Sequence, residues 1–285
     1  MTLIDIRNYY YKILFEYYNR SEIDYYFKIL IKSFFNWEST IVALNPNKKL
    51  SKLQLNKLIK SSKDLKKSYP IQYITGESFF MNLKFKVNKN VLIPRQETEE
   101  LVEWIINDNL SSRKKVQVID IGTGSGCIAV SLSSQKLNFN LSALDNSIES
   151  LLIAKENARL NKVKIDFIHQ DILNPFTNEI IYDIIVSNPP YITFDEINNI
   201  EDKVLNFEPH NSIFVDNKNP LIFYKAILEF SIFNLKEGGM IYFEINPFFF
   251  NTLIALINSY NRFYIIVKKD ISNKNRMIRL KKKHE

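Results

Sequence analysis

An amide side chain followed by two prolines is the part of this sequence best suited to chemistry. Asn188-Pro189-Pro190-Tyr191 follows the apolar run 183–187, which is typical of a buried strand. Because two prolines cannot continue a strand ladder, the chain must leave the sheet here. In an open α/β sheet, ligands bind at the carboxyl ends of the strands. The turn therefore presents an amide side chain and unpaired carbonyl groups, which are acceptors suited to holding a planar NH2 group.

A glycine-rich loop forms a second candidate site. A strand-like run, 116–121, precedes it, and a helical pattern, 127–132, follows it. The loop consists of Gly122, Thr123, Gly124, Ser125 and Gly126. Strand, glycine turn and helix N-terminus open the nucleotide-binding unit of Rossmann-like folds. The Gly-x-Gly-x-Gly pattern resembles motif I of S-adenosylmethionine (SAM) methyltransferases, where the loop holds the methionine part of the cofactor.

Two acidic residues further along the chain extend the cofactor prediction. Asp145 ends a second strand-like run and lies 19 positions after Gly126, the spacing at which a Rossmann-type acid binds ribose hydroxyls. The alternative is that Asp145 caps the helix expected over 148–160. Asp171 ends the third strand, and the methyltransferase resemblance implies that Asp171 and Ile172 contact the adenine. The alternative for Asp171 is a solvent-exposed carboxylate at a strand end.

Three further motifs make the resemblance specific. They are Pro70-x-x-Tyr-x-x-Gly76, the run Leu-Ile-Pro-Arg-Gln-Glu-Thr-Glu over 92–99, and Phe207-Glu208-Pro209. Together with the glycine loop and the Asn-Pro-Pro-Tyr turn, they resemble the peptide chain release factor glutamine methyltransferases, the PrmC/HemK family. The resemblance runs through nearly the whole chain, although the first 70 residues match only in length and helical character.

The resemblance implies an activity and a partner. Family members transfer the methyl group of SAM to the glutamine side-chain amide in the Gly-Gly-Gln motif of class I peptide chain release factors. The oxygen of Asn188 and the carbonyl of Pro189 would accept hydrogen bonds from that amide, and Tyr191 would pack against it. Arg95, Glu97 and Glu99 would line the substrate side. The alternative for these three is a charged helix start. No metal and no nucleic acid substrate is expected.

The sequence departs from the family pattern in two loops. Residues 217–221, Asn-Lys-Asn-Pro-Leu, stand where the family usually has Asp-Gly-Leu. Asn246-Pro247 stand where the family has glycine and often glutamine. Both changes put the geometry of these loops in question, and neither lies in the glycine loop or the catalytic turn.

The predicted secondary structure changes at two points along the chain and so indicates three segments. Residues 1–70 predict an N-terminal helical bundle that docks the release factor, with Ser21 and Ser51 as N-caps. Residues 71–95 predict a β-hairpin linker. Residues 96–285 alternate strands and helices, which predicts an α/β Rossmann-like methyltransferase domain with seven strands.

Composition limits the class of protein. There is no uncharged apolar run of 18 residues or more and no signal-peptide pattern, so we expect a cytoplasmic protein that does not span a membrane. The single cysteine, Cys127, suits a reducing compartment. The net charge of +7 is ordinarily a sign of an anionic partner, but the abundance of Lys, Asn, Ile and Phe indicates a codon bias that accounts for much of the lysine.

Two other functions remain open on sequence alone. A DNA adenine or RNA guanine amino-methyltransferase also acts on a planar NH2 group, so the turn motif does not separate it from a glutamine enzyme. Such a DNA enzyme should carry an insertion that senses flipped bases, and none is evident. A catalytically silent SAM-binding adaptor would be expected to lose Asn188 or a proline of the turn, and this chain keeps them.

Overall fold

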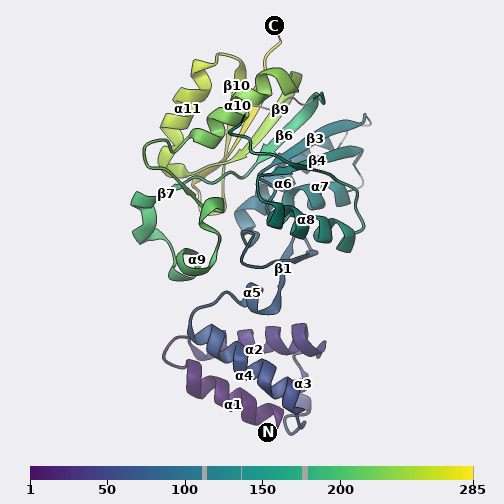
Figure 1. Ribbon diagram of the computed structural model, residues 1–285, viewed down its shortest axis with the longest axis vertical. Coiled ribbons are helices and arrows are strands. Elements are labelled where there is room, and N and C mark those ends of the chain that lie inside the picture. Colours follow the sequence, from purple (N-terminus) through teal and green to yellow (C-terminus); the bar gives the residue numbers. More distant parts are fainter. Residues whose placement is uncertain (111–113, 136, 175–178, 285) are drawn as a thin grey trace. The chain divides into compact units, whose positions relative to one another are not determined.

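The computed structural model describes residues 1–110, 114–135, 137–174 and 179–284 (Figure 1). The chain divides into two compact units. The first comprises Met1–Glu77 and the short segment Glu201–Phe207, and the second comprises Ser78–Ile200 and Glu208–Glu285. Each unit has a hydrophobic core of its own.

The first unit is helical. Its helices are α1 (Leu3–Leu14), α2 (Arg20–Phe35), α3 (Ile41–Leu44), α4 (Lys52–Lys66), α5 (Ile71–Thr75) and α9 (Asp202–Phe207). Capping boxes at Thr2, Asn19 and Ser51 begin the three long helices, because each side chain accepts a hydrogen bond from the N3 backbone amide. The expected cap at Ser51 is confirmed. The expected cap at Ser21 is wrong, since Asn19, two residues earlier, supplies the cap and α2 begins at Arg20.

Apolar side chains at helical spacing hold this unit together. Tyr10 and Phe27 are fully buried, and their rings pack edge to face with centroids 5.1 Å apart. The Tyr10 hydroxyl donates to the Leu58 carbonyl at 2.7 Å, so α1 and α4 are joined by a buried hydrogen bond as well. Near the end of the unit, Tyr69 packs edge to face against Phe207 of α9, with centroids 5.0 Å apart.

A short hairpin follows the helices in the chain. Strands β1 (Glu77–Phe80) and β2 (Leu83–Lys86) are joined by Met81 and Asn82, which have φ values of 49° and 60°. Two central residues with positive φ match the right-handed twist of a tight hairpin. Residues 71–75, in the segment expected as hairpin linker, form helix α5.

A seven-stranded sheet forms the centre of the second unit, as the sequence predicted. Its order is β10-β11-β9-β6-β3-β4-β5. Strands β9, β6, β3, β4 and β5 are parallel, and β11 pairs antiparallel with both of its neighbours, β9 and β10. The strands are β3 (Val116–Ile121), β4 (Phe139–Asp145), β5 (Asp166–His169), β6 (Tyr182–Ser187), β9 (Leu235–Glu244), β10 (Phe263–Lys269) and β11 (Asn275–Lys282).

Helices pack on both faces of this sheet (Figure 1). One apolar cluster joins the sheet to α6 (Gln96–Asn109), α7 (Cys127–Ser134) and α8 (Ile148–Leu160). The other joins it to α10 (Ile222–Asn234) and α11 (Phe250–Ser259). Because both faces are covered, the central strands are buried almost throughout, which explains their continuous apolar runs.

Short elements complete the second unit. They are β7 (Ile192–Thr193), η1 (Phe194–Asn199), η2 (His210–Ser212), β8 (Phe214–Val215) and η3 (Pro247–Phe249). In the described parts of the chain, none of the helices has the length and apolar character needed to cross a membrane.

Candidate active site

The strand order reverses between β3 and β6, and the two sequence motifs meet there. Ile121 of β3 pairs in register with Ser187 of β6, so Gly122 and Asn188 follow at neighbouring carboxyl ends. The Ser187 hydroxyl donates to the Ile121 carbonyl at 2.7 Å, which ties the two strand ends together. In open α/β sheets this reversal point is where ligands bind.

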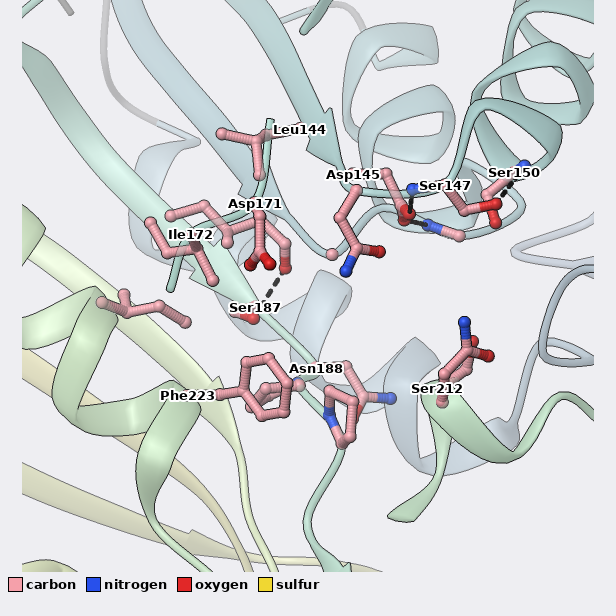
Figure 2. A pocket seen from close by; sticks show the side chains of 18 of the residues that line it. Leu144, Asp145, Ser147, Ser150, Asp171, Ile172, Ser187, Asn188, Ser212 and Phe223 are labelled. Carbon is pink, nitrogen blue, oxygen red and sulfur yellow. Dashed lines mark hydrogen bonds between the residues drawn. The ribbon is translucent and has the colours of Figure 1, made fainter. Parts of the chain in front are cut away.

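A cleft opens at this point, entirely within the second unit. It contains about 730 Å³ of empty space, its open mouth included. Figure 2 shows Asp145 and Asp171 along one side and Asn188 on the opposite side. Among the predicted site residues, those that line the cleft are Gly122, Gly124, Asp145, Asp171, Ile172, Asn188, Pro189 and Pro190.

The glycine loop lets a ligand come close to the backbone. Gly124 has a φ of +54°, and a Cβ atom added there would meet no atom within 4 Å. The position is therefore open toward the cleft that it lines. At Gly126 a Cβ would lie 3.1 Å from Cβ of Ala154, so this glycine allows α7 and α8 to pack closely. Thr123 and Ser125, the other two residues of the loop, are buried and do not line the cleft.

Asp145 is bonded to the glycine loop. Its Oδ2 accepts from the Gly124 amide at 2.8 Å, and its Oδ1 accepts from the Ser147 amide at 2.9 Å. Burial raises the pKa of Asp145, while the two backbone amides favour the charged form. The helix-cap alternative is wrong, because Ser147 caps α8 by accepting from the Ser150 amide. Each carboxylate oxygen keeps a lone pair for a ligand hydroxyl.

Asp171 and Ile172 lie further along the same cleft. Both side chains are half-buried, so Asp171 is not the freely exposed carboxylate of the alternative prediction. Its Oδ1 accepts from the Leu173 amide at 2.9 Å, which fixes the turn after β5. Ile172 packs against the apolar cluster beneath α10 and adds an apolar wall.

Asn188 lies across the cleft from Asp145 and Asp171, and a hydrogen bond holds its side-chain amide. Its Nδ2 donates to the Thr98 hydroxyl at 3.1 Å. Among the described residues, Oδ1 of Asn188 has no hydrogen-bond partner. The acceptor end of the side chain is thus available at the cleft that Asn188 lines.

A buried carboxylate lies behind the turn. Glu244, at the end of β9, is 2% exposed and accepts from the Thr98 hydroxyl at 2.6 Å and from the Tyr191 hydroxyl at 2.8 Å. Burial raises the pKa of Glu244, while those two hydrogen bonds and the charge of Arg276 oppose the rise. Asn188, Thr98, Glu244 and Tyr191 therefore form one connected network.

The charged residues at the start of α6 bond to other parts of the second unit. Arg95 pairs with Glu208, which also accepts from the Ile93 amide at 3.2 Å. Glu99 accepts from the Met81 amide at 2.5 Å. Glu97 is half-buried, and its charge helps to raise the pKa of Glu244. In the described parts of the chain, Arg95, Glu97 and Glu99 do not line the cleft.

The two loops that depart from the family pattern have definite geometry. Asn246 donates through Nδ2 to the Tyr191 carbonyl at 3.0 Å and to the Glu196 carboxylate, also at 3.0 Å. Its Oδ1 accepts from the Phe248 amide, so Asn246 is the N-cap of η3. Asn219 forms a turn with Asp216 that leads into α10. Asn246 thus holds the Asn-Pro-Pro-Tyr turn through the backbone carbonyl of Tyr191.

The pattern-based analysis missed three polar residues near the cleft. Thr98 lies inside the run 92–99, and Glu244 ends the apolar strand β9; the signal of each was a polar residue in an otherwise apolar helix face or strand. Asp120 lies in the buried strand β3, directly before the loop. Its Oδ2 accepts from the Thr123 hydroxyl at 2.6 Å, and its Oδ1 has no hydrogen-bond partner of normal geometry among the described residues.

Comparison with known proteins identifies the class. The family model of the methyltransferase small domain matches residues 101–206. The solved structure of the T. Thermophilus 16S rRNA N2 G1207 methyltransferase (RsmC), in complex with AdoMet and guanosine, is 18% identical with a TM-score of 0.52, over 73% of this chain and 50% of that one. That likeness is one of fold. The sheet order, the cleft and the family model define a methyltransferase with the class I fold.

Sequence relatives narrow the class to a family. The release factor glutamine methyltransferase of Flavobacterium psychrophilum is 42% identical over 98% of this chain and 99% of the relative. That of Lactococcus lactis subsp. lactis is 39% identical over 82% of this chain and 85% of the relative. This chain belongs to the release factor glutamine methyltransferase family, which confirms the resemblance drawn from its motifs.

Proposed function

We propose that this enzyme transfers the methyl group of SAM to the side-chain amide nitrogen of the glutamine in the Gly-Gly-Gln loop of a class I peptide chain release factor. One observation carries the proposal: a glycine loop with its acid and a free amide acceptor, Asn188, line the same cleft. The names of the curated relatives support the substrate class.

The residues of the cleft fit SAM. Gly122 and Gly124 leave open space where side chains would project, and Asp145 offers carboxylate lone pairs to ribose hydroxyls. Behind the loop, Asp120 is a fully buried acid whose Oδ1 has no hydrogen-bond partner of normal geometry among the described residues. Asp171 and Ile172 would flank the adenine. When bound, the cofactor supplies a methyl group activated by the positive charge on its sulfur.

The protein's contribution to the reaction is positioning. An amide nitrogen is a poor nucleophile because its lone pair is delocalised into the carbonyl. In this mechanism Oδ1 of Asn188 and the carbonyl of Pro189 accept hydrogen bonds from the substrate NH2, which orients the nitrogen and favours the positive charge that develops on it. Transfer would form a nitrogen–carbon bond as the sulfur–carbon bond breaks; the sulfur would leave as a neutral thioether, and the nitrogen would release one proton to solvent water. Pro190 shapes the turn, and the Tyr191 ring packs against the amide.

The helical unit would supply recognition of the release factor. Several large apolar side chains of this unit are exposed and accessible to a partner: Phe15, Tyr25, Leu44 and Leu53 are each more than half exposed. We assign docking to residues 1–70, with residues 71–95 as the linker and 96–285 as the catalytic domain.

The alternative acceptors are nucleobases, and one assay separates them. Purified enzyme is incubated with SAM carrying a labelled methyl group and with release factor, DNA or ribosomal RNA. The proposal requires label on the release factor at its Gly-Gly-Gln glutamine. Label on DNA adenine or RNA guanine alone would establish the amino-methyltransferase alternative. No transfer to any acceptor by an enzyme that binds SAM would favour a silent SAM-binding protein.

A further inference from the structure

Thr98 stands between the candidate catalytic amide and a buried acid. Its hydroxyl oxygen lies 3.1 Å from Nδ2 of Asn188 and 2.6 Å from Oε2 of Glu244. The three residues come from different elements: Thr98 from the first turn of α6, Asn188 from the end of β6, and Glu244 from the end of β9. Thr98 is 2% exposed and does not line the cleft in the described parts of the chain.

The direction of each hydrogen bond follows from the number of hydrogens. A threonine hydroxyl has one hydrogen, and an ionised carboxylate can only accept. Two hydroxyl groups, those of Thr98 and Tyr191, converge on separate oxygens of Glu244, so both donate to it when Glu244 is ionised. With its hydrogen committed to Glu244, the Thr98 oxygen can only accept from Asn188. The NH2 end of the Asn188 amide must therefore face Thr98.

This constraint matters because the two ends of an asparagine side chain are nearly equal in shape. An unconstrained amide can rotate by half a turn and exchange its NH2 for its oxygen. If Asn188 rotated, it would present hydrogen-bond donors to the cleft, and these would repel a substrate NH2 group. Only one of the two orientations offers an acceptor to the substrate, and it is the one that Thr98 favours.

We propose that Thr98 is a positioning residue for methyl transfer: its hydroxyl, held by Glu244, fixes the amide of Asn188 with Oδ1 toward the substrate nitrogen. This inference rests on the proposed function, because it needs Asn188 to receive a substrate amide. It also gives the run 92–99 a specific role, in which Thr98 reaches Asn188 while Arg95 pairs with the Glu208 carboxylate and Glu99 accepts from the Met81 amide.

Variants of the full chain test the inference. Thr98→Val and Thr98→Ala remove the hydroxyl, and Thr98→Ser restores it. We expect the first two to lower kcat with release factor about tenfold or more, the effect of losing on the order of 1.4 kcal/mol, with the Kd for SAM unchanged. Thr98→Ser should stay within about twofold of wild type, since it restores the same hydrogen bond. We therefore expect kcat to depend on the presence of the hydroxyl group and not on the volume of the side chain.

Tyr224→Phe is the matched control for structural loss. The Tyr224 hydroxyl is buried and donates to the backbone carbonyl of Glu244 at 3.0 Å, and among the described residues it makes no hydrogen bond to Asn188. This variant should lose stability as the Thr98 variants do, yet keep kcat. A similar fall in kcat in Tyr224→Phe would show that loosening Glu244 is enough and would overturn the specific role of Thr98.

Other outcomes are equally decisive. Wild-type kcat in folded Thr98→Val or Thr98→Ala would overturn the inference, as would a Thr98→Ser enzyme as impaired as Thr98→Val. If neither hydroxyl-free variant folds while Thr98→Ser does, the role of Thr98 is structural and the inference is wrong. If wild-type enzyme fails to methylate release factor, the proposed function itself fails, which is distinguishable because it precedes any comparison of variants.

Discussion

The carboxylate of Asp145 accepts a hydrogen bond from the backbone amide of Gly124 at 2.8 Å, although 21 residues separate them in the chain. The acid that the spacing assigns to the ribose is therefore also a support for the loop assigned to the methionine moiety. Removing the carboxylate affects both ends of the cofactor site. Asp145→Ala should weaken SAM binding more than the loss of one ribose contact would.

Substitution in the glycine loop should weaken SAM binding directly. Gly124→Ala places a methyl group in the cleft and strains a backbone with φ of +54°. We expect SAM affinity to fall at least about tenfold by calorimetry, the equivalent of roughly 1.4 kcal/mol. Gly76→Ala is the control, because Gly76 also has positive φ and open surroundings but lies outside the cleft. Unchanged SAM affinity in folded Gly124→Ala would contradict the cofactor assignment.

Asp120 should make stability depend on pH. Burial raises its pKa to about 7 from a usual value of 3.8, against the opposing effects of the Thr123 hydroxyl and the Ala129 amide. The folded state therefore binds more protons than the unfolded state between these values. The unfolding free energy should fall as pH rises from about 4 to about 7, by an amount on the order of a few kcal/mol, and then level off.

Denaturation of the ligand-free protein across this pH range measures the effect. Asp120→Asn has no charge to gain, so its unfolding free energy should lack this contribution to the slope. The difference between the two proteins isolates Asp120 from other acids with raised pKa values, such as Glu244. Parallel curves for wild type and Asp120→Asn would mean that Asp120 is already ionised throughout the range.

Asn246 should stabilise the catalytic turn. Asn246→Ala removes the donor to the Tyr191 carbonyl and to Glu196, so we expect a loss of about 1–3 kcal/mol in unfolding free energy and slower methyl transfer. Asn161→Ala is the control, because the Asn161 side chain donates to the Lys84 and Asn157 carbonyls away from the cleft. Both variants are assayed under conditions in which each is fully folded, as judged by urea denaturation. Equal rates of methyl transfer would show that Asn246 does not support the turn.

The helical unit should be needed for the protein substrate and not for SAM. A protein shortened to residues 78–285 should retain its SAM affinity, because every residue that lines the cleft belongs to the second unit. It should methylate intact release factor poorly if docking resides in the helices. The comparison is kcat/KM of the short and full-length proteins at saturating SAM, and equal values would exclude a docking role.

Local patterns in the sequence were enough to predict the sheet and the cleft motifs. The apolar runs before Gly122 and Asn188 indicated buried parallel strands, and their turns indicated the carboxyl ends. The cap at Asn19 was missed because two polar residues, Asn19 and Ser21, flank the same helix start and the pattern does not choose between them.

Contacts between distant segments were beyond such patterns. Thr98 and Glu244 are 146 residues apart, and only the fold brings α6 beside the end of β9. For the same reason the charges near Thr98 could not be assigned: Arg95 pairs with Glu208 and Glu99 binds the Met81 amide, partners that the local sequence does not contain. The role of Asn246 likewise depends on Tyr191 and Glu196, which only the fold brings beside it.

The most direct test of the central claim is methyl transfer to release factor by wild type and by Asn188→Ala. The account predicts that wild type places one methyl group on the Gly-Gly-Gln glutamine, located by peptide mass spectrometry. It predicts that Asn188→Ala binds SAM and unfolds as wild type does but transfers about a hundredfold more slowly, because one transition-state acceptor is lost. Wild-type rates in Asn188→Ala, or methylation of any other group by the wild-type enzyme, would contradict it.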